Sequence, residues 1–231
     1  MEDGRGGGGD GRTFRVGCDE AGKGPVLGPM VAAAVRADPA ALPDGIDDSK
    51  RIAPSRREEI AAALRERDAV TVGVAVVPPS RIDAPETDMN SLTVAAHAEA
   101  VAAAARDGDA VVADAGDVDE ARFGRRVASG VGDAGVEVSV RAEHGGDESY
   151  ALVGAASIVA KVERDARVAA IAEEYAEYGP VGSGYPSDGT TRAFLREYVG
   201  ETGELPDCAR ASWSTCDDVL AAAAQSSLDQ F

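Results

Sequence analysis

The sequence has few aromatic residues, lysines and cysteines, and it contains no long apolar run. Aromatics make up only 4% of its 231 residues, and alanine and valine supply much of the 44% apolar content. The three cysteines are too scattered for a disulfide framework, so we expect a reducing, cytoplasmic environment. No stretch approaches the length of a membrane span, and Met1 precedes acidic and glycine residues, which are not typical of a signal peptide. We therefore expect a cytoplasmic protein with no membrane partner.

Charge of one sign dominates the chain. It carries 41 acidic residues against 23 Lys plus Arg, a formal charge of −18, which taken alone argues against a nucleic-acid partner. However, the acids are spread along the chain and the basic residues are almost all arginine, a composition that resembles cytoplasmic proteins of salt-accumulating halophiles. At about 1 M salt the Debye length is roughly 3 Å, so long-range repulsion from a polyanion largely vanishes. Net charge therefore does not exclude a nucleic-acid substrate.

Residues 18–30 carry the most informative pattern. A short predicted strand leads into the adjacent acids Asp19 and Glu20, and such a pair usually needs a cation to keep both side chains ionised. The glycine–lysine–glycine sequence at positions 22–24 then offers bare backbone amides and one cation to an anion. Acids for metal beside amides for phosphate indicate phosphoryl chemistry. The alternative is a simple Asp-Glu turn with flexible glycines.

Lysine occurs only at positions 23, 50 and 161, and each lies in a segment that carries other chemical signals. A chain that otherwise uses arginine would keep lysine where a compact point charge meets a phosphate. We therefore interpret Lys23, Lys50 and Lys161 as candidate phosphate contacts.

Strand and helix patterns alternate along the chain and end in helices, which predicts an α/β domain with a C-terminal helical extension. We expect a disordered tail over 1–11, a catalytic domain over 12–200, a helical segment over 201–224 and a tail over 225–231. The expected strands cover 13–18, 26–35, 70–77, 110–114 and 136–140, and the expected helices cover 54–67, 90–106, 149–178, 190–199 and 217–224.

Two further acids lie where a site would need them. Asp114 ends a short apolar strand, the position at which open α/β sheets place their ligands, although a turn or helix-capping aspartate would look the same. Asp147 opens the long helical stretch, where a capping role and a ligand role can coexist. Ser157, Lys161 and Arg164 follow on one stripe of that helix, and we expect Arg164 on a solvated face.

Tyr185 stands on a glycine-flanked turn, where an aromatic ring can stack on a sugar or base or simply pack at a helix junction. His97, on an alanine-rich helix, is expected to be a core histidine and not a ligand. His144 is harder to dismiss because it neighbours Asp147. The histidines and cysteines together show no zinc spacing.

These motifs, in this order, resemble the type 2 ribonuclease H family, ribonuclease HII, in its archaeal branch. The resemblance implies an RNase H-like mixed β-sheet flanked by helices, with a C-terminal helical extension. It also implies an endonuclease that hydrolyses the RNA strand of RNA–DNA hybrids and cuts 5′ to ribonucleotides embedded in duplex DNA. The segments that carry it are residues 19–30, 48–50, Asp114, 143–144, Asp147, 155–165, 182–188 and 210–215.

The family pattern also implies roles for individual residues. Two Mg²⁺ or Mn²⁺ ions would be held by the four catalytic acids Asp19, Glu20, Asp114 and Asp147, giving 5′-phosphate and 3′-hydroxyl products. Many family members have arginine where this chain has Lys23, which keeps the charge but loses bidentate geometry. The implied substrate-binding residues are Gly22, Lys23, Gly24, Lys50, Ser157, Lys161 and Tyr185.

The last seven residues place Gln225, Leu228 and Phe231 at a spacing that resembles the peptide by which replication proteins bind the sliding clamp, PCNA. An ordinary frayed tail is the alternative. We expect a monomer that acts in DNA replication and repair. Two other functions are left open: an RNase H-like nuclease with another nucleic-acid substrate, and a non-catalytic clamp-binding module with the same fold.

Overall fold

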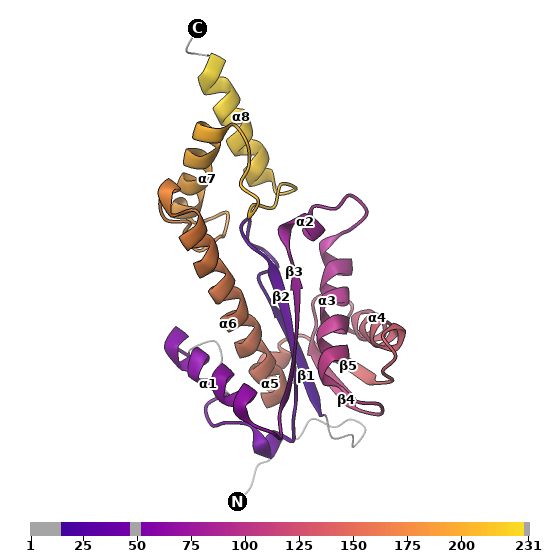
Figure 1. The fold of residues 1–231 in the computed structure, drawn as a ribbon. Coiled ribbons are helices and arrows are strands. Elements are labelled where there is room, and N and C mark those ends of the chain that lie inside the picture. The colour runs from indigo at the N-terminus through magenta and orange to yellow at the C-terminus, as the bar shows by residue number, and fades with distance from the viewer. Residues whose placement is uncertain (1–14, 47–51, 229–231) are drawn as a thin grey trace, which may run out of the picture.

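A mixed five-stranded sheet forms the centre of the molecule (Figure 1). The computed structural model describes residues 15–46 and 52–228. In the order β3-β2-β1-β4-β5, neighbouring strands are antiparallel up to β1, while β1, β4 and β5 run parallel. The strands are β1 (Val16–Ala21), β2 (Met30–Arg36), β3 (Thr71–Val77), β4 (Ala110–Asp114) and β5 (Ser139–Glu143). The expected RNase H-like mixed sheet is confirmed.

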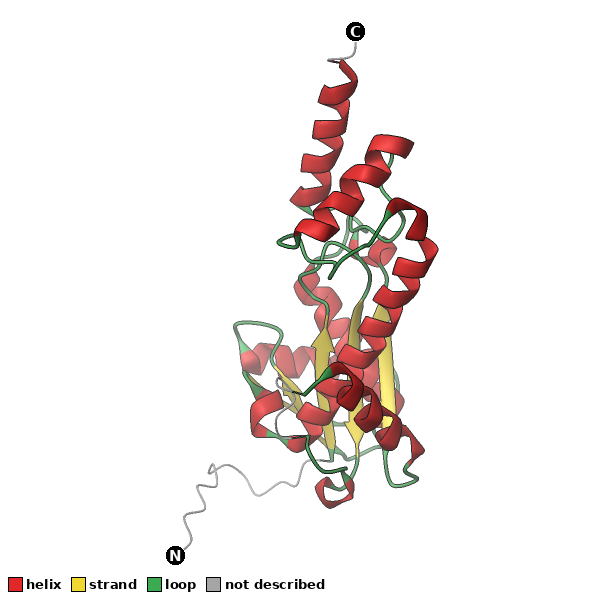
Figure 2. Ribbon diagram, turned by 90° about the vertical axis from the view of Figure 1, so that its left-hand side faces the viewer, coloured by secondary structure: helices red, strands yellow, loops and turns green. Residues whose placement is uncertain are grey.

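Helices cover both faces of the sheet, and the last two extend beyond it (Figures 1 and 2). On one face lie α3 (Met89–Ala104) and α4 (Glu120–Asp133), and on the other α1 (Pro54–Glu66) and the long α6 (Ala151–Glu174). A third cluster joins α7 (Gly189–Thr202) and α8 (Ser214–Leu228) to the segment after β1. The short elements are η1 (Pro39–Ala41), α2 (Pro79–Ile82), α5 (Gly146–Ser149) and η2 (Ala176–Tyr178). None of the described helices is long and apolar enough to cross a bilayer.

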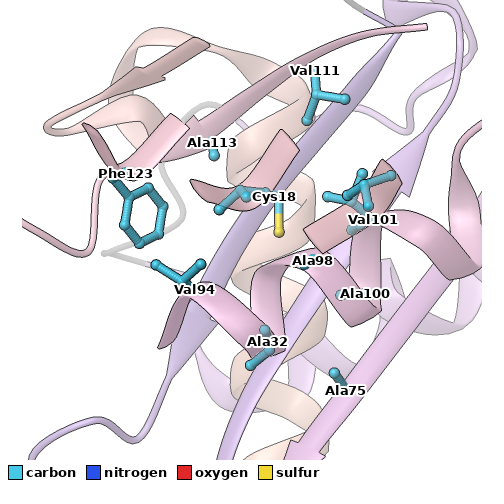
Figure 3. Packing of buried hydrophobic residues seen from close by; sticks show 14 of the residues in the cluster. Cys18, Ala32, Ala75, Val94, Ala98, Ala100, Val101, Val111, Ala113 and Phe123 are labelled. Atoms are coloured by element: carbon cyan, nitrogen blue, oxygen red, sulfur yellow. The ribbon is translucent and has the colours of Figure 1, made fainter. Parts of the chain in front are cut away.

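The alternation of side chains along β1 divides the core between the two faces. Val16 and Cys18 pack with α3 and α4 residues in a cluster that includes Phe123 and Val101 (Figure 3). Gly17 faces α6 so closely that a Cβ atom built there would lie 2.1 Å from the backbone carbon of Leu152. Small residues therefore bring the layers to backbone contact.

Several element boundaries differ from the expected ones. The first strand runs to Ala21, so Asp19 and Glu20 are strand residues and do not lie in the loop; its predicted first residues, 13 and 14, lie outside the described residues. The strands expected at 26–35 and 136–140 run instead from Met30–Arg36 and Ser139–Glu143. The stretch 149–178 is split into α5, α6 and η2, because Tyr150 has extended backbone angles and interrupts the helix.

Two differences concern helices. The sequence analysis missed α4, although Phe123, Val127 and Val131 repeat every four residues on one side of it and pack in the cluster shared with the sheet and α3. The last helix begins at Ser214 and continues to Leu228, so Gln225 lies in a helix and not in an extended tail. The tail expected over 1–11 lies outside the described residues.

We predict that Gly17→Ala destabilises the fold, because its methyl group would collide with the backbone of Leu152 and push α6 away from β1. Overpacking of this kind costs about 1–3 kcal/mol, which chemical unfolding at high salt would measure. Gly200→Ala is the matched control, since nothing lies within 4 Å of its Cβ position on α7. A Gly17→Ala protein as stable as the control would contradict the packing described here.

Candidate active site

The predicted acids meet at the carboxyl ends of two adjacent parallel strands. Register pairs Cys18 of β1 with Ala113 of β4, so Asp19 and Asp114 occupy the next position on each strand. The charges of Glu20 and Asp114 both act on Asp19, and those of Glu20 and Asp147 act on Asp114. The structure thus brings all four predicted acids into electrostatic contact.

Asp19 is buried on the α6 face of the sheet, with only 7% of its surface exposed. Its Oδ1 accepts a hydrogen bond from the backbone N–H of Glu20 at 2.7 Å. Burial raises the pKa of Asp19 to about 7, the charge of Glu20 adds to the rise, and a hydrogen bond with Ser157 opposes it. Like-charge crowding and loss of water therefore both disfavour a bare carboxylate here.

Glu20 points to the opposite face, toward α3. Its Oε2 lies 2.8 Å from Nε2 of His97, a fully buried side chain packed edge-to-face on Phe123. Although burial acts to raise it, the pKa of Glu20 is lowered by the hydrogen bond and charge of His97. His97 is a core histidine as expected, but sequence reasoning missed that it orients a predicted catalytic acid.

Asp114 is anchored by the helix that follows β5. Its Oδ1 accepts a hydrogen bond from the backbone N–H of Gly146, the first residue of α5, at 2.8 Å. Burial raises the pKa of Asp114, and the charges of Glu20 and Asp147 add to the effect. Asp147 lies on α5 and is partly buried, whereas His144 before it is exposed.

The donor set suits a hard divalent cation such as Mg²⁺ or Mn²⁺, because all four predicted ligands are carboxylates. Among the described residues, no three Asp, Glu, His or Cys side chains are close enough to one another to bind a single metal ion. Ion binding would have to draw these carboxylates closer.

The glycine loop between β1 and β2 lies beside the acids. Gly22 has a φ of 86°, a left-handed angle that favours glycine, and Gly24 is exposed. Lys23 does not extend freely into solvent: its Nζ donates to the carbonyl oxygen of Gly116 at 2.5 Å and lies 3.5 Å from Oδ1 of Asn90. The lysine therefore links this loop to the segment that follows Asp114.

A buried arginine from the C-terminal region holds the underside of the glycine loop. Arg210 is completely buried and donates to the carbonyl oxygens of Gly22, Lys23 and Gly28 at 2.6, 2.9 and 3.0 Å. Its guanidinium lies over the ring of Trp213, whose Nε1 donates to another loop carbonyl. The sequence analysis recognised the motif at residues 210–215. It could not predict the role of Arg210, because these contacts join residues almost 190 positions apart.

The remaining candidates come from α6 and the turn at 182–188. Ser157 is buried and accepts a hydrogen bond from Nζ of Lys161 at 2.9 Å. Tyr185 is 44% exposed, and the guanidinium of Arg164 lies 5.7 Å from its ring centre. The expectation that Arg164 lies on a solvated face is wrong, because the glycine loop at Gly22 and the turn at Gly184 cover its side chain. Lys50 falls outside the described residues.

Comparison with known proteins identifies the family. The model of the ribonuclease HII family matches residues 16–216, which is most of the chain. The chain belongs to the ribonuclease HII family. A ribonuclease HII from Haloarcula marismortui is 64% identical over 218 residues, covering 94% of this chain and 100% of that protein. The predicted archaeal, halophile-like resemblance is confirmed, and family membership makes this chain an enzyme, a ribonuclease H endonuclease.

Solved structures agree with the assignment to the ribonuclease HII family. The ribonuclease H2 of Pyrococcus horikoshii has a TM-score of 0.80 at 34% identity, covering 90% of this chain and 97% of that chain. The RNase HII in the PCNA:RNase HII complex from Archaeoglobus fulgidus has a TM-score of 0.75, also at 34% identity, covering 88% and 95%. The ribonuclease H fold is therefore shared over almost the whole length.

We predict that Arg210→Met destabilises this ribonuclease HII family member, because one buried and two partly buried carbonyl groups lose their donor. A hydrogen bond to a charged group contributes about 1.5–3 kcal/mol, so the free energy of unfolding should fall by at least about 3 kcal/mol. Chemical unfolding would measure the change, with the exposed Arg196→Met on α7 as the control. Equal losses in the two variants would show that Arg210 does not hold the loop.

Proposed function

We propose that the protein hydrolyses the RNA strand of RNA–DNA hybrids and cuts 5′ to ribonucleotides embedded in duplex DNA. The observation that carries this proposal is the meeting of four acids beside a glycine loop at the ends of β1 and β4. Ribonuclease H activity on RNA–DNA hybrids follows from the family. Incision at single ribonucleotides and the 5′-phosphate and 3′-hydroxyl products are the finer part of the proposal.

Asp19, Glu20, Asp114 and Asp147 would hold two divalent ions, Mg²⁺ or Mn²⁺. When bound, such ions supply an activated water and offset charge on the leaving oxygen. In the protein itself, Ser157 orients Asp19 and His97 orients Glu20 from opposite faces of the sheet. The carboxylates are thus aimed by buried groups that do not contact solvent.

The substrate would lie across the glycine loop, α6 and the turn at 182–188. Backbone amides at Gly22, Lys23 and Gly24 would contact the ribonucleotide, and Tyr185 would stack on its sugar. Lys161 would meet a flanking phosphate, and Ser157 would assist it through the hydrogen bond between them. Lys50 is proposed for another phosphate on the sequence resemblance alone.

We predict that Asp19→Asn abolishes cleavage but leaves the fold intact, because the change removes a proposed ligand and also relieves charge repulsion. Substitutions that only orient metal ligands cost about 10–100-fold, so the rate should fall by more than about a hundredfold. The assay compares an RNA–DNA hybrid, a DNA duplex with one ribonucleotide and the matched all-DNA duplex, at high salt with Mg²⁺, with Mn²⁺ and with a chelator. Wild-type protein should cut the first two only, and only with metal.

Asp165→Asn provides the control, since Asp165 is an exposed acid on α6 whose partner Arg57 is 3.5 Å away. Near-normal cleavage by Asp19→Asn would contradict the assignment of the four acids as the active site. Cleavage of the hybrid but not of the single-ribonucleotide duplex would remove the finer substrate claim. A wild-type protein that binds hybrid without cutting it would favour the non-catalytic module.

We also propose that the C-terminal residues bind the sliding clamp. The A. fulgidus RNase HII was solved in complex with PCNA. In this chain α8 continues to Leu228, and Gln225 and Leu228 are three residues apart in the sequence. Phe231 repeats the same spacing but lies outside the described residues. A peptide with a polar, an aliphatic and an aromatic residue at this spacing suits binding in a hydrophobic groove.

We predict that Phe231→Ala weakens binding to the cognate PCNA by about tenfold or more, as expected when an aromatic anchor of an interface is truncated. Titration calorimetry at high salt would measure the affinity, with Gln230→Ala as the control. Cleavage of a short hybrid without PCNA should not change. Equal PCNA affinity of wild type and Phe231→Ala would show that the tail is not the docking peptide.

A further inference from the structure

Arg164 is a buried cation beneath both proposed substrate-contacting loops. It lies on α6 one turn beyond Lys161, and only 7% of its surface is exposed. Burial lowers the pKa of Arg164, which shows that its environment disfavours the charge. A long charged side chain is rarely placed in this way without a compensating partner.

The expected partners of this guanidinium are absent from the part of the chain that the structure describes. Its Nε and Nη2 atoms are buried without a hydrogen-bond partner, and it takes part in none of the ion pairs there. The neighbouring acids pair elsewhere: Glu163 contacts Arg65, and Asp165 contacts Arg57. A buried charge that is offset only by the Tyr185 ring and the charge of Asp165 costs stability, so its presence points to a role in function.

The two loops pack directly on Arg164. A Cβ atom at Gly22 would lie 2.5 Å from its Cδ and Nε atoms, and one at Gly184 would lie 3.3 Å from its Nη2 atom. The ring of Tyr185 lies 5.7 Å from its Cζ atom. The loops are joined beside it, since the backbone N–H of Val26 donates to the carbonyl of Gly184 at 2.8 Å. The Arg164 side chain therefore lies against both Gly22 and the ring of Tyr185, while Gly24 approaches that ring directly, with its Cβ position 3.8 Å from Cε1.

We propose that Arg164 is a positioning residue for sugar recognition, which holds the Gly22 loop and the Tyr185 ring at the spacing that distinguishes a ribonucleotide from a deoxyribonucleotide. This inference rests on the proposed function of the same site. In this inference Arg164 acts through the two loops, because they cover its buried Nε and Nη2 atoms. Its loss should therefore change the ratio of affinities for the two sugars and not simply the strength of binding.

The test compares binding of two duplexes, one with a single ribonucleotide and one all-DNA, by fluorescence anisotropy at high salt with a chelator to prevent cleavage. Arg164→Met should weaken binding of the ribonucleotide duplex roughly tenfold, and it should change binding of the all-DNA duplex less than about twofold. Arg164→Lys keeps the charge but lacks the planar group, so it should lose a part of the preference. Arg167 lies three residues further along α6 and is more exposed than Arg164, so Arg167→Met should keep the preference for the ribonucleotide duplex.

Thermal unfolding separates positioning from a structural role. Because Arg164→Met removes an unpaired buried charge, its unfolding temperature should equal or exceed that of wild type. Both affinities falling together with a lower unfolding temperature would overturn the inference, as would an unchanged ratio. So would a wild-type protein that binds the duplexes equally. Cleavage of the RNA–DNA hybrid by wild-type protein is measured in a separate assay. Failure of this inference can therefore be distinguished from failure of the proposed function.

Discussion

The fold must hold acidic side chains together at one edge of the sheet although their charges repel one another. Strand pairing between β1 and β4 forces Asp19 and Asp114 into neighbouring positions. Burial and the charge of Glu20 raise the pKa of Asp19 to about 7, which shows how strongly this position disfavours the ionised form of Asp19. Backbone-to-backbone packing opposes this repulsion, at Gly17 against α6 and at Gly73 against α3. The small residues of the core are thus part of what makes the site possible.

The sequence predicted those features that depend on neighbouring residues. An acid at the end of a short apolar strand is a local pattern, so Asp114 was placed correctly, with its strand at its observed bounds. Helix α4 was missed because Gly124, Gly130 and Gly132 weaken its helical signal. Two of these glycines are needed for packing, since a Cβ atom at Gly130 would lie 2.7 Å from Ala98 and one at Gly124 would lie 3.2 Å from the Val140 carbonyl. Tertiary contact therefore outweighed local preference.

The features that sequence reasoning missed join distant parts of the chain. Nothing near His97 indicates that its ring faces Glu20, 77 positions earlier. Likewise, a stripe of polar residues on α6 shows that they share a side, but not whether that side meets solvent or the loops that cover Arg164. Motif resemblance could find Tyr185 and the glycine loop. Only the fold shows that Arg164 packs against both of them.

The position of charge in the structure explains how so acidic a chain could bind a polyanion. The formal charge is −18, yet two arginines beneath the glycine loop, Arg164 and Arg210, take part in no ion pair among the described residues. Burial lowers the pKa of Arg210 to about 10, and the charge of Arg164 adds to the effect. Salt screens the exposed acids at distances beyond a few ångströms, whereas buried charges are screened much less. A phosphate that reaches the loop would therefore meet two buried cations as well as the carboxylates of the site, while salt screens the more distant exposed acids.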